Sequence, residues 1–184
     1  MTSNDVISVR VLRKIGFLCR YAYAKLVCPI NVLLFKRFAY GSFVHPLASV
    51  RNYRNISIGA HTTINRNVIL WPSKLYIGDW VEINPGTVIY GEVAVGNFCM
   101  IGPNVVLAGG THGTKLEKAM RFQPSEDQRI VIGEDVWIGA NASVTGGVVI
   151  AEGCIIGAGS VVTRSTAPFG IYVGSPARLI SYRK

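Results

Sequence analysis

An aliphatic residue recurs every six positions through most of this chain, and this period constrains the fold more strongly than any other feature of the sequence. The fifteen positions form five groups of three: Ile58, Ile64 and Leu70; Ile77, Ile83 and Ile89; Val95, Ile101 and Leu107; Ile132, Ile138 and Val144; Ile150, Ile156 and Val162. Glycine directly follows seven of them, which suits tight bending of the chain. Such a period is typical of a solenoid, in which stacked units bury a shared core.

Each six-residue unit predicts a short strand followed by a corner, and three units close one triangular coil of 18 residues. Successive coils then stack at the strand spacing of about 4.8 Å, with each aliphatic side chain above its counterpart in the previous coil. The sequence therefore predicts an all-β protein, with a parallel β-helix over residues 56–176. The period is broken by one extra residue near Tyr76 and by a polar insertion of 19 residues, 113–131, which we expect to be a functional loop.

The formal net charge of +9 is concentrated near the N-terminus. Residues 1–54 contain nine lysine or arginine residues and one acid, whereas residues 55–184 contain ten basic and nine acidic residues. Projected onto a helix, residues 6–27 place their basic side chains opposite an apolar side. We therefore expect a basic amphipathic helical segment over residues 1–39, and a β-helix domain with an inserted loop and a C-terminal tail over residues 40–184.

Two roles for the N-terminal segment remain open. It could cap the first coil, whose unpaired strand edges otherwise invite aggregation. Alternatively, residues 6–27 could lie in the membrane interface, with their cations on anionic headgroups. Nucleic acid is not expected as a partner, because no recognition motif accompanies the basic helix.

Several features predict a reducing, cytoplasmic location. The longest apolar run, residues 26–35, contains Pro29 and Asn31 and is shorter than the roughly 20 residues that cross a bilayer. Basic residues interrupt every apolar stretch near the start, so no cleavable signal peptide is expected. The four cysteines have no CxxC or metal-finger spacing, and we expect buried reduced thiols: Cys19, Cys28, Cys99 and Cys154. If the N-terminal helix binds lipid, the protein would be peripheral at the inner face of the membrane.

Three motifs in the second half of the chain resemble bacterial hexapeptide-repeat acyltransferases. They are residues 133–140 (GEDVWIGA), residues 157–163 (GAGSVVT) and residues 174–178 (GSPAR). Together they look like the saccharide O-acetyltransferase branch, which includes maltose and galactoside acetyltransferases and enzymes that modify capsule and exopolysaccharides. The resemblance implies a left-handed β-helix, although parallel crossovers are otherwise almost always right-handed. It also implies acetyl-CoA as co-substrate and a homotrimer whose active sites are shared between neighbouring protomers.

Histidine is the natural general base for transfer of an acyl group to a hydroxyl, because the ordinary pKa of its side chain is about 6.5. His112 lies where the third coil ends and the insertion begins, and the resemblance makes it the catalytic base. His45 and His61 are expected to be structural or solvent-exposed. No metal site is expected, because the zinc-dependent members of this fold need three convergent histidines with one closely spaced pair.

The resemblance also assigns residues that bind the two substrates. Asn84 and Glu92 would contact the acceptor sugar, although Asn84 could instead belong to an asparagine ladder or make a turn hydrogen bond. The residues assigned to acetyl-CoA are Trp137, Ala140 (through its backbone N–H, as oxyanion donor), Ala158, Thr163, Arg164 and Arg178. The two arginines suit the phosphates of CoA, but each could equally be an ordinary solvated cation.

These features predict an O-acetyltransferase that acts on a saccharide or lipid-linked glycan of the cell envelope. Acetyl transfer would proceed by direct attack in a ternary complex, because neither Cys99 nor Cys154 has a histidine beside it in sequence. Two alternatives remain: an N-acyltransferase for an amino-sugar nucleotide, and a catalytically silent trimeric scaffold.

Overall fold

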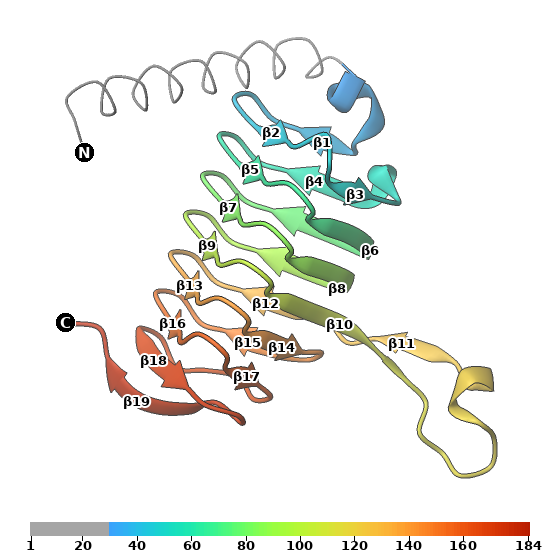
Figure 1. Ribbon diagram of the computed structural model, residues 1–184, viewed down its shortest axis with the longest axis vertical. Helices are drawn as coiled ribbons and strands as arrows, with labels where there is room; N and C mark the ends of the chain where they lie inside the picture. The colour runs from blue at the N-terminus through green and yellow to red at the C-terminus, as the bar shows by residue number, and fades with distance from the viewer. Residues whose placement is uncertain (1–29) are drawn as a thin grey trace, which may run out of the picture.

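The structure, a computed structural model, describes residues 30–184. Most of it is a stack of triangular coils (Figure 1). The three faces of the solenoid are built by short strands, one from each coil. The first face contains β1 (Arg37–Phe38), β4 (Ile56–Ile58), the second halves of β6 (Ile69–Ile77) and β8 (Val88–Val95), β12 (Ile130–Ile132) and β15 (Val149–Ile150). The second face contains β2 (Phe43–Val44), β5 (Thr63–Ile64), β7 (Glu82–Ile83), β9 (Met100–Ile101), β13 (Trp137–Ile138), β16 (Ile155–Ile156) and β18 (Gly170–Val173). The third face contains β3 (Ser49–Val50), the first halves of β6 and β8, β10 (Val106–His112), β14 (Ser143–Thr145) and β17 (Val161–Val162).

All pairs of strands between consecutive coils are parallel, and the aliphatic positions stack in register. On the first face, Ile58 pairs with Ile77, which pairs with Val95, and the column continues through Ile132 and Ile150. All fifteen positions of the six-residue period are buried. Each such side chain contributes about 1.5–3 kcal/mol by leaving water, so the stacked columns stabilise the fold substantially. The predicted all-β, left-handed parallel β-helix is confirmed.

The glycines and the bends of the chain have separate roles at the corners. A Cβ on Gly96 would lie 2.7 Å from the carbonyl carbon of Gly133 in the next coil, so glycine is needed there for close stacking. Positive φ angles occur instead three residues after the aliphatic position, for example at His61 (54°) and Asn141 (59°). The left-handed conformation is thus carried by this later residue and not by the glycine directly after the aliphatic residue, where the sequence predicts the bend.

Both predicted interruptions occur, with different boundaries. The extra residue is a bulge in β6 between Pro72 and Lys74, a few residues before Tyr76. The insertion is an arm rather than a simple loop (Figure 1). Strand β10 runs out of its coil and pairs antiparallel with β11 (Ser125–Asp127), and a turn of 3-10 helix, η2 (Met120–Phe122), lies near the tip. The chain rejoins the solenoid in β12, so the last residues of the predicted loop belong to a core strand.

The two ends of the solenoid are closed differently. At the first coil, residues 30–34 are helical and Phe35 is buried against Phe38 and Tyr53, with a second short 3-10 turn, η1 (Tyr53–Asn55), at the adjoining corner. At the other end, β19 (Arg178–Tyr182) folds back antiparallel on β18. The amphipathic helix predicted over residues 6–27 lies outside the described residues. Within residues 30–184, no helix has the length and apolar character needed to cross a membrane.

Candidate active site

His112 is the last residue of β10, on the part of the strand that has left the coil. Up to Gly109 this strand pairs with β8, and from Gly110 onward it pairs with β11. His112 therefore lies opposite Ser125, and the Ser125 hydroxyl is 3.0 Å from the imidazole Nδ1. If Nδ1 carries the proton and donates to the hydroxyl, the lone pair of Nε2 is left to accept a proton from a substrate. The ring is exposed, at the base of the arm.

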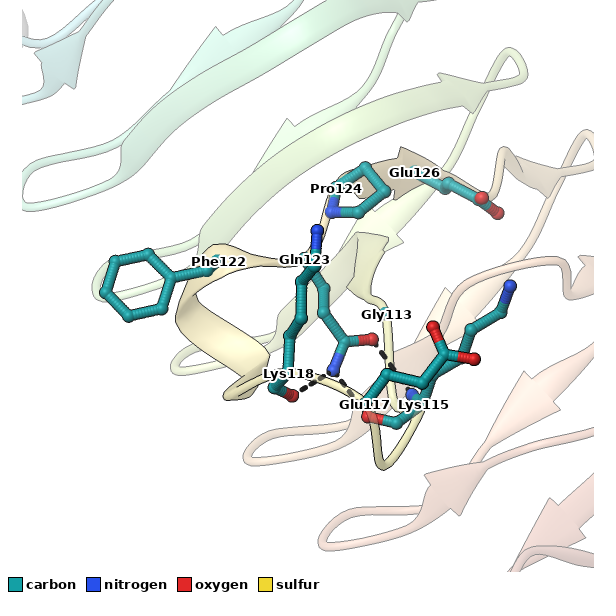
Figure 2. Close-up of a pocket in the computed structure, with 8 residues that line it drawn as sticks. All are labelled: Gly113, Lys115, Glu117, Lys118, Phe122, Gln123, Pro124 and Glu126. Atoms are coloured by element: carbon teal, nitrogen blue, oxygen red, sulfur yellow. Dashed lines mark hydrogen bonds between the residues drawn. The ribbon is translucent and has the colours of Figure 1, made fainter.

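The tip of the arm is ordered by a single side-chain amide (Figure 2). Gln123 Oε1 accepts a hydrogen bond from the Lys115 N–H at 2.9 Å, and its Nε2 donates to the carbonyls of Lys115 and Lys118, both at 2.7 Å. Phe122 points away from this amide and is exposed. Together with Met120 and Arg121, it lines a hollow beside His112. The arm thus places the histidine beside two exposed apolar side chains, Met120 and Phe122.

A second hollow lies on the second face of the solenoid. It is a shallow groove of about 430 Å³ whose lining includes Asn84, Trp137, Ala140 and Ala158, four residues assigned to substrates from the sequence. Trp137 stands between Met100 and Ile155 on neighbouring coils, and its ring is half-exposed. This outward apolar column is suited to a long, mostly apolar group such as pantetheine.

The corner beside this groove offers free backbone donors. At this corner the coils carry Pro85, Pro103, Ala140 and Ala158 in turn, each two residues after a buried aliphatic position. Proline has no N–H, whereas Ala140 and Ala158 have one and no acceptor for it among residues 30–184. A backbone N–H beside an open groove can stabilise the oxyanion of an acyl-transfer intermediate. Along this corner of the stack, Ala140 is therefore the first residue after the two prolines that can offer a backbone N–H to a ligand in the groove.

Asn84 and Glu92 each have partners within the protein. The Asn84 side-chain amide donates to the carbonyl of Ile101 in the next coil at 3.1 Å, a bond between coils rather than within a turn, and the residue still lines the groove. Glu92 lies 3.8 Å from Lys74 Nζ and 3.7 Å from Arg129 Nε. Arg129 directly precedes the strand that rejoins the coil. Glu92 therefore stands at the base of the arm and on a different face from Asn84.

The three remaining residues assigned to CoA gather near the last corner. Val161 is hydrogen-bonded through its N–H to Gly174 and through its carbonyl to Ala177. This pairing brings Arg178 close to the end of β17, where Thr163 and Arg164 follow, and all three are exposed. Among the described residues, the Arg178 guanidinium donates only to the neighbouring Ala177 carbonyl, at 3.0 Å. Both arginines are thus open to an anionic ligand.

The other histidines and the buried thiols take part in packing. His61 stacks on Trp80 with ring centroids 4.3 Å apart, and His45 Nδ1 accepts a hydrogen bond from the Leu47 N–H. Burial raises the pKa of the Cys99 thiol to about 11, which disfavours a nucleophilic thiolate. Cys154 is likewise buried. In the described part of the chain, no group of three or more His, Cys, Asp or Glu side chains could hold a metal ion.

The structure thus brings the assigned residues into three groups. Asn84, Trp137, Ala140 and Ala158 share the groove on the second face, and His112 and Glu92 belong to the arm and its base. The third group, near the last corner, is Thr163, Arg164 and Arg178. Sequence reasoning missed Ser125, because its contact with His112 depends on the antiparallel pairing of β11 with β10. It also missed Met120 and Phe122, since nothing in their spacing indicates that the arm turns them toward the histidine.

Comparison with known proteins is consistent with this geometry. The family model described as bacterial transferase hexapeptide (six repeats) matches residues 129–164. The Escherichia coli (strain K12) protein WcaF, named for an acetyltransferase role in colanic acid biosynthesis, is 31% identical over 129 residues, 68% of this chain and 69% of that protein. A Schizosaccharomyces pombe protein named as an acetyltransferase is 43% identical over 88 residues, and the match spans only 42% of its length.

Among solved structures, the N-acyltransferase AntD from Bacillus cereus, in complex with dTDP and 3-hydroxybutyryl-CoA, superposes with a TM-score of 0.76. It is 27% identical in sequence, and the superposition covers 85% of this chain and 87% of that chain. The similarity therefore extends over nearly the whole solenoid.

Proposed function

Because this chain belongs to the bacterial hexapeptide-repeat transferase family, we propose that it transfers an acetyl group from acetyl-CoA to a hydroxyl of a saccharide. The observation that carries the proposal is the exposed His112, whose Nδ1 faces Ser125 while its Nε2 has no partner within residues 30–184. A sugar acceptor is supported by the name of WcaF, and a CoA thioester donor by the AntD complex.

In the proposed reaction, His112 Nε2 takes the proton of the acceptor hydroxyl as the oxygen attacks the thioester carbonyl carbon. The carbonyl oxygen becomes an oxyanion, which the Ala140 N–H stabilises. The intermediate collapses by breaking the carbon–sulfur bond, and CoA leaves as a thiolate that receives the proton from the imidazolium. Trp137 would line the pantetheine arm, with Ala158 and Thr163 farther along it. Arg164 and Arg178 would bind the phosphates.

We further propose a homotrimer in which each active site is shared. His112 is carried by the arm, whereas the groove of Trp137 and Ala140 lies on the second face of the solenoid. An arm that projects from one protomer is suited to reach the groove of a neighbour. In this arrangement Asn84, and Glu92 at the base of the arm, contact the acceptor sugar.

Replacement of His112 by Ala tests the proposal. General-base catalysis is worth about 10²–10⁴-fold in rate, so we expect kcat to fall by that factor while binding of CoA, measured by calorimetry, is retained. His45→Ala is the matched control, because it removes a histidine that lies far from the arm in sequence. Acetyl transfer by His112→Ala at the wild-type rate would rule out the proposed base.

The similarity to AntD supports a second candidate, N-acylation of an amino-sugar nucleotide. The two activities separate in one assay, in which the same enzyme is offered acetyl-CoA with a hydroxyl-only glycan or with an amino-sugar nucleotide. Turnover only with the amine would favour N-acylation. Failure to bind acetyl-CoA at all would favour a silent scaffold.

A further inference from the structure

The first coils of the solenoid carry a charge unlike that of the rest of the chain. Residues 30–78, here called the basic end, contain six lysine or arginine residues, and no acid occurs between Asp5 and Asp79. Residues 79–184 contain eight basic and nine acidic residues. The boundary falls within the stack of coils, so one end of the solenoid is cationic and the remainder is nearly neutral.

Within residues 30–184, most cations of the basic end have no partner. Lys36, Arg37, Arg54 and Arg66 are exposed, and none makes an ion pair or a side-chain hydrogen bond with another described residue. By contrast, Lys74, at the edge of this region, lies beside Glu92. Unpaired cations without nearby carboxylates produce a positive potential that attracts an anionic surface.

Exposed apolar side chains occupy the rim of the same first coil. Leu33 in the helical turn is 70% exposed, Tyr40 at the first corner is 84% exposed, and Leu47 at the second corner is 65% exposed. Ile30 and Val32 lie beside Leu33 and are about half exposed. In Figure 1 the helical turn lies at the end of the stack, beyond β1 and β2. Apolar tips among unpaired cations are the combination that binds at a membrane interface, where aliphatic groups enter the acyl boundary and cations meet the headgroups.

We infer that the basic end docks the protein onto an anionic lipid bilayer, with the solenoid axis directed away from the surface. A free polyanion would be attracted by the same charges, but it gives no reason for solvent-exposed leucine and isoleucine side chains beside them. Three parallel pairings separate β3 on the rim from β10. At about 4.8 Å per coil, the arm would then lie on the order of 15 Å above the first coil.

The test is flotation of the full-length chain with vesicles of phosphatidylcholine, alone or mixed with phosphatidylglycerol. A triple variant, Lys36→Gln with Arg37→Gln and Arg54→Gln, removes three unpaired charges. Each basic residue near an anionic surface contributes about fivefold in binding, so we expect the partition coefficient for the mixed vesicles to fall on the order of 100-fold at low salt. The matched control removes three exposed charges elsewhere, at Lys115, Lys118 and Lys184, and is expected to float like the wild type.

A second variant separates lipid insertion from simple charge attraction. Leu33→Ser with Leu47→Ser should weaken flotation at both low and high salt, whereas the effect of the charge variant should vanish at high salt. Equal flotation of the wild type with neutral and mixed vesicles, or wild-type flotation of the charge variant, would overturn the inference. So would tight binding of duplex DNA by a protein that does not float. Acetyl transfer to a soluble acceptor should be unchanged in the Lys36/Arg37/Arg54 and Leu33/Leu47 variants, so the test is independent of the proposed function.

Discussion

The contact between Ser125 and His112 makes the sharpest prediction about catalysis. Its distance of 3.0 Å joins the serine hydroxyl to imidazole Nδ1, the nitrogen that does not face the acceptor in the proposed reaction. In the resting enzyme this is a bond between neutral groups, worth about 1 kcal/mol net, whereas a bond to a charged group contributes about 1.5–3 kcal/mol. The imidazole becomes charged only as the acceptor proton is transferred, so the difference of about 1 kcal/mol belongs to the transition state.

We therefore expect Ser125→Ala to lower kcat about fivefold, because about 1.4 kcal/mol corresponds to tenfold in rate. The loss stays small since both residues are exposed and water can replace the hydroxyl. Steady-state kinetics with acetyl-CoA and the acceptor would measure it, with Ser73→Ala, on an exposed part of β6, as the control. The KM for acetyl-CoA should not change. An unchanged kcat, or a defect confined to that KM, would refute a positioning role for Ser125.

A negatively charged side chain at position 125 should change the pH dependence of kcat/KM, which a merely structural role of Ser125 would not do. In Ser125→Asp, a carboxylate faces Nδ1 and stabilises the imidazolium. The base is active only when neutral, so the acidic limb of the kcat/KM profile should move to higher pH. Ser125→Asn has nearly the same size without the charge, and its acidic limb should stay in place. Superimposable profiles for Asp and Asn would contradict the proposed contact.

Two further predictions concern the solenoid. Ile138 and Trp137 are adjacent in β13, but Ile138 is buried in the core and Trp137 faces outward. Ile138→Ala should therefore lower the free energy of unfolding by about 2–5 kcal/mol, whereas Trp137→Ala should weaken CoA binding with little loss of stability. Urea titration and calorimetry on both variants would show whether the two effects separate. Burial raises the pKa of the Cys99 thiol to about 11, above the value of about 8.5 for a thiol in an unfolded chain. The contribution of this shift to the free energy of unfolding is therefore complete below about pH 8.5 and declines by at most about 3 kcal/mol as the pH rises toward 11. Urea unfolding between neutral and alkaline pH should therefore show a steeper loss for the wild type than for Cys99→Ala, and parallel curves would disprove this.

The solenoid was predictable from the sequence because its repeat is local. Each buried aliphatic position, such as Ile77 or Ile138, is specified by its own six-residue unit, and stacking the units requires no knowledge of distant segments. The glycines that follow these positions were also read from the sequence, although their role is close coil-to-coil contact rather than bending. The candidate base His112 was found through family resemblance and its place at the break in the period.

Other features depend on contacts that the period does not encode. Residues 113–131 have no repeat, and only the folded chain shows that Ser125 lies opposite His112 and that Gln123 orders the tip. Whether a lysine or arginine is paired likewise depends on neighbouring coils: Lys74 meets Glu92, whereas Arg54 meets no carboxylate in residues 30–184. A short repeat determines the stacking of a solenoid, because every unit contacts only its neighbours in the stack. The pairing of an inserted arm and the partners of surface charges are set by residues far apart in sequence, and only the tertiary structure decides them.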